Sequence, residues 1–314
     1  MTVRDRTPVD VHQHLWSPPL VEALRRRRVP PYLDGWKLHL AGEPPYDVDP
    51  ADHDVAPRDA RVRADGLGRA LISLSCPLGV EALPPREARP LLDAHHEGTA
   101  ALPASFGGWA AACLSEIDPP ALERALDRGF AGLQLPAAAL AGPREMERSA
   151  PLLDVLEARD LPLFVHPGPV PGGGSAASGS RLAVPGWWAA LVPYVQDMHA
   201  AWFAFRAFGR ARHPRLRVCF AMLAGLAPLH GERAAARGGG RGEVDPDAFV
   251  ETSSYGPRAV DAAVRALGVD VIVHGSDRPY ARPVDAGLGE AARHAFRVAN
   301  PHRLLLGEER ARVV

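Results

Sequence analysis

The stretch Val9-Asp10-Val11-His12-Gln13-His14, near the start of the chain, is the one on which the fold prediction depends. It is a short, partly β-branched run that predicts a strand. Residues two apart on a strand point to the same side, so His12 and His14 are expected to face one mouth of the fold. Two imidazoles on one rigid strand suit a transition metal such as zinc. A His-x-His pair alone is weak evidence for a metal site, so further ligand-type residues elsewhere in the chain are needed to support one.

Further short apolar runs follow this strand, and Ala/Leu/Arg-rich stretches separate them. Strands are predicted at residues 9–16, 70–76, 100–106, 130–135, 161–166, 216–222, 249–254 and 269–275. The clearest helical stretches are residues 119–128, 151–159, 187–208 and 258–267. This alternation predicts an α/β fold, and eight such units in a chain of this length form a (β/α)8 TIM barrel. An open doubly wound sheet is the alternative, but no Gly-x-Gly-x-x-Gly follows the first strand, so a dinucleotide site is not expected.

Two segments are longer than a barrel requires. Residues 17–68 follow the first strand and contain the alternating stretch Trp36-Lys37-Leu38-His39-Leu40, which predicts a small hairpin insertion. Residues 167–186 are rich in Gly and Pro and follow the fifth strand, on the face where barrel active sites are built. They form either a lid or a plain surface loop. Residues 1–314 are therefore predicted to be one barrel domain with this insertion and this loop.

The composition excludes several classes of protein. Of 314 residues 46% are hydrophobic, and the formal net charge is −1, so neither disorder nor binding to nucleic acid or an anionic membrane is indicated. Lys37 is the sole lysine and lies in no Schiff-base or P-loop context. The three cysteines favour neither a disulfide framework nor a thiolate zinc site. Without a signal peptide or a membrane span in the sequence, we expect a cytoplasmic protein that acts on a small molecule. The sequence leaves a homodimer open.

Two more ligand-type residues lie at the ends of predicted strands. The fifth strand ends at His166, just before a Pro-Gly turn, and Asp277 lies at the end of the eighth. In a barrel the eighth strand closes beside the first, so Asp277 is expected near His12 and His14. Three imidazoles and one carboxylate would bind one divalent metal and leave room for water. Such a metal lowers the pKa of its bound water to about 7.

These motifs resemble the amidohydrolase superfamily, and within it the amidohydrolase-2 branch that includes aminocarboxymuconate-semialdehyde decarboxylase. The similar pieces are Asp10-Val11-His12-Gln13-His14, Phe164-Val165-His166-Pro167, Gly275-Ser276-Asp277-Arg278-Pro279 and the segment 223–233. The resemblance spans residues 8–306. It implies a distorted TIM barrel that usually holds one zinc ion, with manganese as the other candidate. It also implies the metal ligands, which would be His12, His14, His166 and Asp277.

One position departs from the pattern of that branch. The branch usually has a His at the end of the sixth strand, and counting back from Pro228 and Arg233 places Met222 there. A thioether cannot shuttle protons. Met222 shares the strand parity of Phe220, so it is expected to point into the barrel mouth and form an apolar wall against the substrate. His230 and His199 are the candidates for the missing acid–base group.

Other residues near the strand ends are candidates for substrate binding. Arg278 follows a predicted ligand, and it either binds a substrate carboxylate or forms an ion pair that holds the eighth loop. Trp16 follows the His-x-His strand, and it either forms a wall for a flat substrate or packs in the core. His95 and His96, by contrast, lie in an Ala/Glu context and are predicted on the solvated face of a helix.

Metal-dependent hydrolysis of an ester, lactone or amide bond in a small, partly apolar substrate is the function predicted first. Asp277, at the edge of the metal, would take the proton of the metal-activated water. The alternative is non-oxidative decarboxylation of an aromatic or dienoic carboxylic acid, which the resemblance implies and which needs a proton delivered to carbon. A third interpretation is an inert barrel that binds a ligand without turning it over.

Overall fold

A strand forms at or beside each of the eight predicted places in the computed structural model, which describes residues 7–41, 45–168, 185–239 and 243–313. Most side chains of these strands are buried, as expected for parallel strands that helices cover. The strands are β1 (Val9–Gln13), β5 (Arg69–Ile72), β6 (Phe106–Gly108), β7 (Leu133–Pro136), β8 (Leu163–His166), β9 (Val218–Phe220), β10 (Ala248–Glu251) and β11 (Ile272–Val273).

The strands close into a ring in chain order. β1, β5 and β6 form one parallel sheet, and β7 to β11 form another. One junction between the two sheets is the bond from the Ala110 N–H to the Gly132 carbonyl, at 2.9 Å. The other is the bond from the Val11 N–H to the His274 carbonyl, at 3.0 Å. These two junctions close the (β/α)8 barrel that the sequence predicts.

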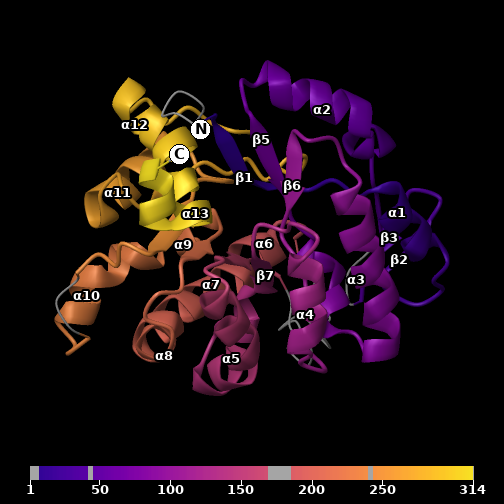
Figure 1. Ribbon diagram of the computed structural model, residues 1–314, viewed down its shortest axis with the longest axis horizontal. Helices are drawn as coiled ribbons and strands as arrows, with labels where there is room; N and C mark the ends of the chain where they lie inside the picture. The colour runs from indigo at the N-terminus through magenta and orange to yellow at the C-terminus, as the bar shows by residue number, and fades with distance from the viewer. Residues whose placement is uncertain (1–6, 42–44, 169–184, 240–242, 314) are drawn as a thin grey trace.

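Helices surround the ring (Figure 1). Many begin with Pro in the first turn, where its missing N–H leaves no helix bond unmade. In α4, for example, the Asp118 side chain also accepts a bond from the Ala121 N–H and caps the helix. The helices are α1 (Pro18–Arg25), α2 (Val55–Ala64), α3 (Pro85–Ala100), α4 (Pro119–Leu126), α5 (Pro143–Ala158), α6 (Trp188–Leu191), α7 (Pro193–Ala204), α8 (Arg210–Arg212), the short turn α9 (Met222–Gly225), α10 (Gly231–Ala235), α11 (Pro257–Leu267), α12 (Glu290–His294) and α13 (Asn300–Val313).

Large side chains fill the barrel below its mouth. Trp109 and Phe164 are fully buried, and their rings stack with centroids 5.1 Å apart. Burial of an aromatic ring such as Phe164 stabilises the fold by roughly 2–3 kcal/mol. The Trp109 indole N–H donates to the Val11 carbonyl at 2.9 Å, so its one polar atom is paired. Because the His12 ring lies 5.0 Å from that of Phe164, this layer is the floor of the candidate site.

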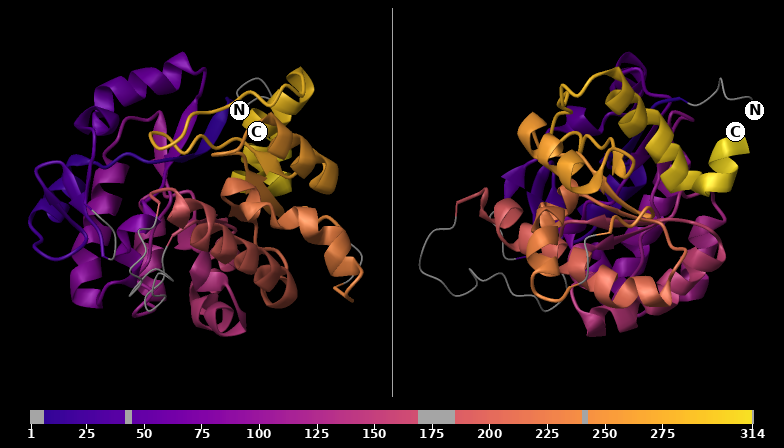
Figure 2. Two further views of the ribbon diagram at one scale, coloured as in Figure 1. Left: turned by 180° about the vertical axis from the view of Figure 1, so that it is seen from behind. Right: turned by 90° about the vertical axis from the view of Figure 1, so that its left-hand side faces the viewer.

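The insertion after the first strand is a small antiparallel sheet accompanied by α1. Its strands β2 (Tyr32–Asp34), β3 (Lys37–His39) and β4 (Tyr46–Asp47) pair in that order, so the predicted hairpin is confirmed and gains a third strand. The insertion lies on the side of the barrel away from α10, in Figure 1 and in the reverse view of Figure 2. The His53 ring stacks on Trp16 at 4.5 Å, which joins the insertion to the chain just after β1.

Two local predictions are wrong. The third barrel strand is Phe106–Gly108 rather than residues 100–106, because α3 continues through Ala100. A Cβ at Gly108 would lie 2.4 Å from the Thr99 side chain, so this strand uses glycine where α3 packs against it and lacks the β-branched signal of a strand. His95 and His96 are also not solvated, since their exposed fractions are 1% and 8%.

Three further expectations concern the chain as a whole. The Gly/Pro-rich loop predicted at residues 167–186 falls mostly on residues 169–184, which lie outside the described part of the chain. Among the described helices, none combines the length and the apolar character needed to cross a bilayer. Cys76, Cys113 and Cys219 are free thiols, as their spacing predicts.

Candidate metal centre

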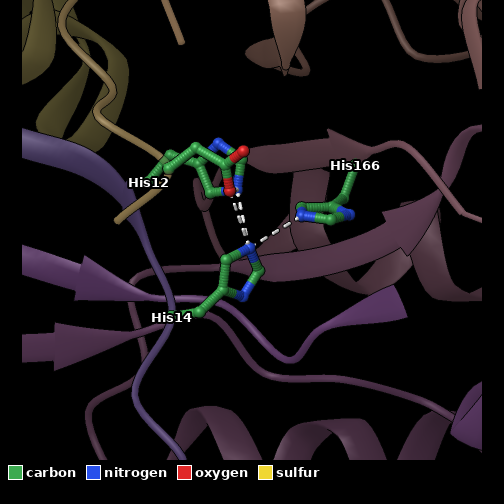
Figure 3. Close-up of side chains that lie close together, drawn as sticks. His12, His14 and His166 are labelled. Atoms are coloured by element: carbon green, nitrogen blue, oxygen red, sulfur yellow. Dashed lines mark hydrogen bonds and ion pairs between the residues drawn. The ribbon is translucent and has the colours of Figure 1, made fainter. Parts of the chain in front are cut away.

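Four predicted ligand residues from three barrel strands meet at the mouth. His12 lies on β1, His14 follows that strand directly, His166 ends β8, and Asp277 follows β11. One ligand atom from each of them lies within 4.8 Å of all the others. The three imidazole rings point toward one another, two from the stretch of chain at the end of β1 and one from the end of β8 (Figure 3). The His14 Nε2 atom lies 3.2 Å from the Nε2 atoms of both His12 and His166, and 3.1 Å from Oδ1 of Asp277.

The protons of these rings lie on the sides that face away from the cluster. The Nδ1 atom of His14 lies 2.9 Å from the Ser73 carbonyl, and that of His166 lies 2.6 Å from the Pro167 carbonyl. A carbonyl oxygen only accepts, so both Nδ1 atoms carry hydrogen in these bonds and both Nε2 atoms present lone pairs. The Nδ1 atom of His12 likewise donates its hydrogen, to the Glu251 carboxylate at 3.2 Å. Three lone pairs and a carboxylate oxygen converging on one point are a donor set that fits a divalent metal.

The electrostatics keep most of this donor set unprotonated. Burial lowers the pKa of His14 and, together with the neighbouring imidazoles, lowers that of His166 well below its ordinary value. For Asp277, burial by itself raises the pKa, but the imidazoles of His12 and His14 outweigh it and lower the pKa to about 2. For His12, burial lowers the pKa, but the carboxylates of Asp277 and Glu251 outweigh burial and raise it. A carboxylate and two neutral imidazoles are therefore ready to coordinate.

Buried polar bonds hold the first and last strands in register beneath the site. The Asp10 carboxylate accepts the backbone N–H groups of His12 and Ser276, each at 3.1 Å. Asp277 has a left-handed backbone, with φ 55°, and its N–H donates to the His12 carbonyl at 2.8 Å. A left-handed conformation at an aspartate is unfavourable unless its surroundings hold it, and such positions cluster at functional sites. The eighth loop is thus tied directly to the His-x-His strand.

Met222 does not occupy the strand position expected of it. β9 ends at Phe220, and residues from Met222 to Leu226 all have positive φ, so the chain makes a left-handed turn there. The Met222 side chain is 9% exposed and packs in the main core cluster. Its backbone N–H donates to Oε1 of Glu251 at 2.7 Å. The parity argument fails here because alternation of faces holds only while the strand continues.

The other predicted site residues have structural partners. The Trp16 side chain is 2% exposed, and its indole N–H donates to the Ser75 hydroxyl. Arg278 forms an ion pair with Asp65 at 3.1 Å, which is the structural alternative predicted for it. His230 is exposed, and its ring lies 5.0 Å from that of His199. Roles for these residues and for Met222 in substrate binding stay predictions.

Sequence reasoning missed three residues beside the cluster. Glu251, the last residue of β10, contacts His12 as described. The Ser75 hydroxyl lies 3.2 Å from Nδ1 of His14, and the half-exposed Tyr280 ring lies 5.2 Å from the His14 ring. Glu251 carried a usable signal, because an acidic residue at the end of the seventh strand of a barrel faces the same mouth as the other strand ends. The other two lie on loops, where no periodicity indicates a direction.

No protein-family model matches the chain, and no curated protein matches it in sequence. Solved structures do match its fold. The 5-carboxyvanillate decarboxylase LigW from Sphingomonas paucimobilis superimposes with a TM-score of 0.72 and 19% identity, over 96% of this chain and 99% of that one. A dihydroxybenzoic acid decarboxylase from Polaromonas sp. JS666, with bound manganese and the inhibitor 2-nitroresorcinol, has a TM-score of 0.68 and 18% identity, over 96% and 97% of the two chains. An amidohydrolase II has a TM-score of 0.69 and 20% identity, over 95% and 99%. The chain has the fold of these proteins.

This likeness confirms, at the level of fold, the resemblance to amidohydrolase-2 proteins that the sequence motifs indicate. It extends over nearly the whole length of each chain compared, so the barrel and its insertion are shared together. Two of the three proteins are named as decarboxylases of aromatic acids. Their activities belong to those proteins, and the likeness to this chain is one of fold.

Proposed function

We propose that this protein is a metal-dependent, non-oxidative decarboxylase of a small aromatic or dienoic carboxylic acid. The observation that carries the proposal is the meeting of three Nε2 lone pairs and one carboxylate at the mouth of this barrel. Barrels of the same fold are named as decarboxylases of 5-carboxyvanillate and dihydroxybenzoic acid. A small, partly apolar carboxylic acid is also compatible with the exposed Tyr280 ring beside the cluster.

His12, His14, His166 and Asp277 would hold the metal. A divalent ion at this point would bind the carboxylate of the substrate and stabilise the negative charge that develops during the reaction. Three nitrogen atoms and one oxygen suit zinc, and they also suit manganese, which the Polaromonas enzyme contains. We propose one ion per chain, zinc or manganese.

Asp277 is the member of the cluster that can exchange a proton with the substrate. Its side chain is 19% exposed, whereas the three imidazoles are almost fully buried. Its Oδ1 atom faces the His14 ring, while Oδ2 accepts a long hydrogen bond of 3.4 Å from the hydroxyl of the exposed Ser254. The Asp277 carboxylate would take a proton from the substrate hydroxyl or from solvent and deliver it to carbon.

Decarboxylation needs only a proton donor and acceptor and no oxidant or reductant. The proton adds to the ring carbon that bears the carboxylate. The bond between that carbon and the carboxyl carbon then breaks, and its electron pair restores the aromatic ring as CO2 leaves. The buried Phe164 and Trp109 close the site from below and exclude water from this side.

Hydrolysis is the second candidate, and one observation favours it. The low pKa of Asp277, about 2, keeps its carboxyl group ionised at neutral pH. An ionised carboxylate suits the removal of a proton from water, which hydrolysis of an ester, lactone or amide requires. The amidohydrolase II of the same fold is consistent with such chemistry.

A substrate panel separates these functions. The protein, loaded with Mn²⁺ or Zn²⁺, is incubated with hydroxybenzoic and dienoic acids and, separately, with esters and lactones. Decarboxylation predicts release of CO2 from the acids, and in D2O the product carries one deuterium at the carbon that lost CO2. Acid release from esters or lactones without CO2 would instead support hydrolysis. Saturable binding of these compounds with no turnover would support the inert barrel.

A further inference from the structure

Glu251 is a fully buried carboxylate directly behind the candidate metal centre. It ends β10 and accepts four hydrogen bonds. Two come from Ser253, whose N–H and hydroxyl lie at 2.7 and 2.5 Å. A third comes from the Met222 N–H at 2.7 Å, and the fourth from Nδ1 of His12 at 3.2 Å. One side chain therefore joins a predicted metal ligand on β1 to the left-handed turn after β9.

No cationic side chain balances the charge of Glu251 within the described residues. The other fully buried carboxylate near the site, that of Asp10, is linked through the Gln13 amide to the Arg58 guanidinium, by bonds of 2.8 and 2.7 Å. Glu251 has only neutral donors besides the His12 ring. A buried carboxylate without a counter-charge is strongly destabilising, so a positive charge is expected at the His12 ring, either as an added proton or as a cation bound at its Nε2 atom.

We propose that Glu251 is a positioning residue of the metal centre, an inference that rests on the metal site in the proposed function. It holds the His12 proton on Nδ1, so that Nε2 keeps its lone pair toward the metal. With Asp277 it also makes up two negative charges, which match the charge of one divalent ion among three neutral imidazoles. Its bond to the Met222 N–H anchors the left-handed turn through the backbone rather than through a side chain.

The Glu251 side chain packs closely against the backbone at Gly275. A Cβ added at Gly275 would lie 2.1 Å from Oε2 of Glu251 and 3.0 Å from Cβ of His12. Glycine at this place on the chain just after β11 is therefore what lets the carboxylate reach His12. Gly275→Ala would displace Glu251 or His12 while leaving every charge in place. This variant therefore tests whether metal binding depends on the position of the Glu251 carboxylate as well as on its charge.

The test measures metal binding directly. Glu251→Gln keeps the size of the side chain and removes its charge, and Glu251→Asp keeps the charge on a shorter stem. Glu81→Gln is the matched control, because Glu81 is also a buried glutamate, at 1% exposure, but bonds to Cys76 and Gln134 instead of the cluster. The affinity of each protein for Co²⁺ and Mn²⁺ is measured by competition with a chelator. The visible absorption of bound Co²⁺ reports the ligand geometry.

Glu251→Gln is expected to weaken metal affinity by roughly 10- to 100-fold and to shift the Co²⁺ spectrum. Glu251→Asp should recover part of that affinity, and Glu81→Gln should bind as the wild type does. Equal affinity and an unchanged spectrum in Glu251→Gln would overturn the inference. If that variant does not fold, Glu251→Asp and Gly275→Ala decide, and wild-type affinity in both would overturn it as well.

The same titration separates this inference from the proposed function. A wild-type protein that binds no divalent metal overturns both. A wild-type protein that binds metal through a Glu251-dependent site, and yet releases no CO2 from any acid in the panel, overturns decarboxylation and leaves the role of Glu251 supported.

Discussion

Two groups of buried histidines lie in this barrel, and they differ in what their free ring atoms face. At the mouth, His12, His14 and His166 turn their Nε2 atoms toward one another. On α3, the two neighbouring histidines each bond the backbone near β6. The His95 Nε2–H donates to the Trp109 carbonyl at 3.1 Å, and Nε2 of His96 accepts the Ala111 N–H at 3.0 Å.

The difference shows that burial of a histidine does not by itself indicate a functional site. Both groups are nearly inaccessible to solvent, and burial is the largest cause acting on the pKa in each. In the α3 pair, however, the Nε2 atoms themselves bond the backbone that follows β6. In the mouth cluster it is Nδ1 of His14 and of His166 that bonds the backbone, and the Nε2 atoms are left to converge on one point, which is the arrangement that a cation completes.

The largest expected effect is that of Asp277→Asn on turnover. An amide neither accepts a proton nor ligates a cation as a carboxylate does. We expect kcat/KM on an identified substrate to fall by roughly two to four orders of magnitude, the range of general acid–base catalysis. Circular dichroism should show the fold retained. A variant that turns over at the wild-type rate would remove Asp277 from the reaction.

Metal content tests the contrast between the two histidine groups. His166→Ala removes one of few ligands, and we expect metal affinity to fall by more than about 100-fold, since even partners behind the ligands are worth 10- to 100-fold. His95→Gln keeps a donor for the Trp109 carbonyl and should retain the wild-type metal content by elemental analysis. Loss of metal in both variants would erase the distinction between the groups.

The α3 pair should make the protein sensitive to acid. Burial lowers the pKa of His95 to about 4 and that of His96 to about 3. In the unfolded chain both groups titrate near pH 6.5, so below that pH the unfolded state binds protons that the folded state does not. The free energy of unfolding therefore falls as the pH drops from 6.5 toward 4, by roughly 3 kcal/mol for each histidine.

Urea denaturation of wild type and His95→Gln across this pH range checks the acid effect. The variant lacks one titrating group, so its free energy of unfolding should fall less steeply than that of the wild type. Any pH-dependent loss of stability that is due to the mouth cluster occurs in both proteins, so it cancels when their free energies of unfolding are compared. Parallel curves would contradict the assignment of the acid sensitivity to His95.

The smallest expected effect is that of Met222→Leu. Met222 bonds Glu251 through its backbone N–H, and leucine retains that hydrogen bond. Leu and Met have similar volumes, so the free energy of unfolding should change by less than about 1.5 kcal/mol. Metal affinity should stay within about twofold, an estimate that follows from the unchanged hydrogen bond to Glu251. A tenfold loss of affinity would assign the Met222 side chain a role at the metal.

The barrel and the meeting of the four candidate ligand residues could be predicted because they depend on local periodicity. Alternation along β1 puts His12 and His14 on one side, and parallel strands in a closed barrel bring all their carboxyl ends to one mouth. These rules place His166 and Asp277 beside the pair without knowledge of any contact. The single barrel domain, the cytoplasmic location and a homodimer stay predictions.

Tertiary structure alone decided the features that depend on contacts between distant residues. Whether a histidine on α3 is solvated depends on which helix face meets β6, and the polar character of the stretch around His95 and His96 predicts the wrong answer. The direction of Met222 depends on where β9 ends and a left-handed turn begins. The partner of Glu251 lies 239 positions away along the chain, at His12. Local sequence determines which face a side chain takes within an element, but the fold determines which side chains from separate elements meet.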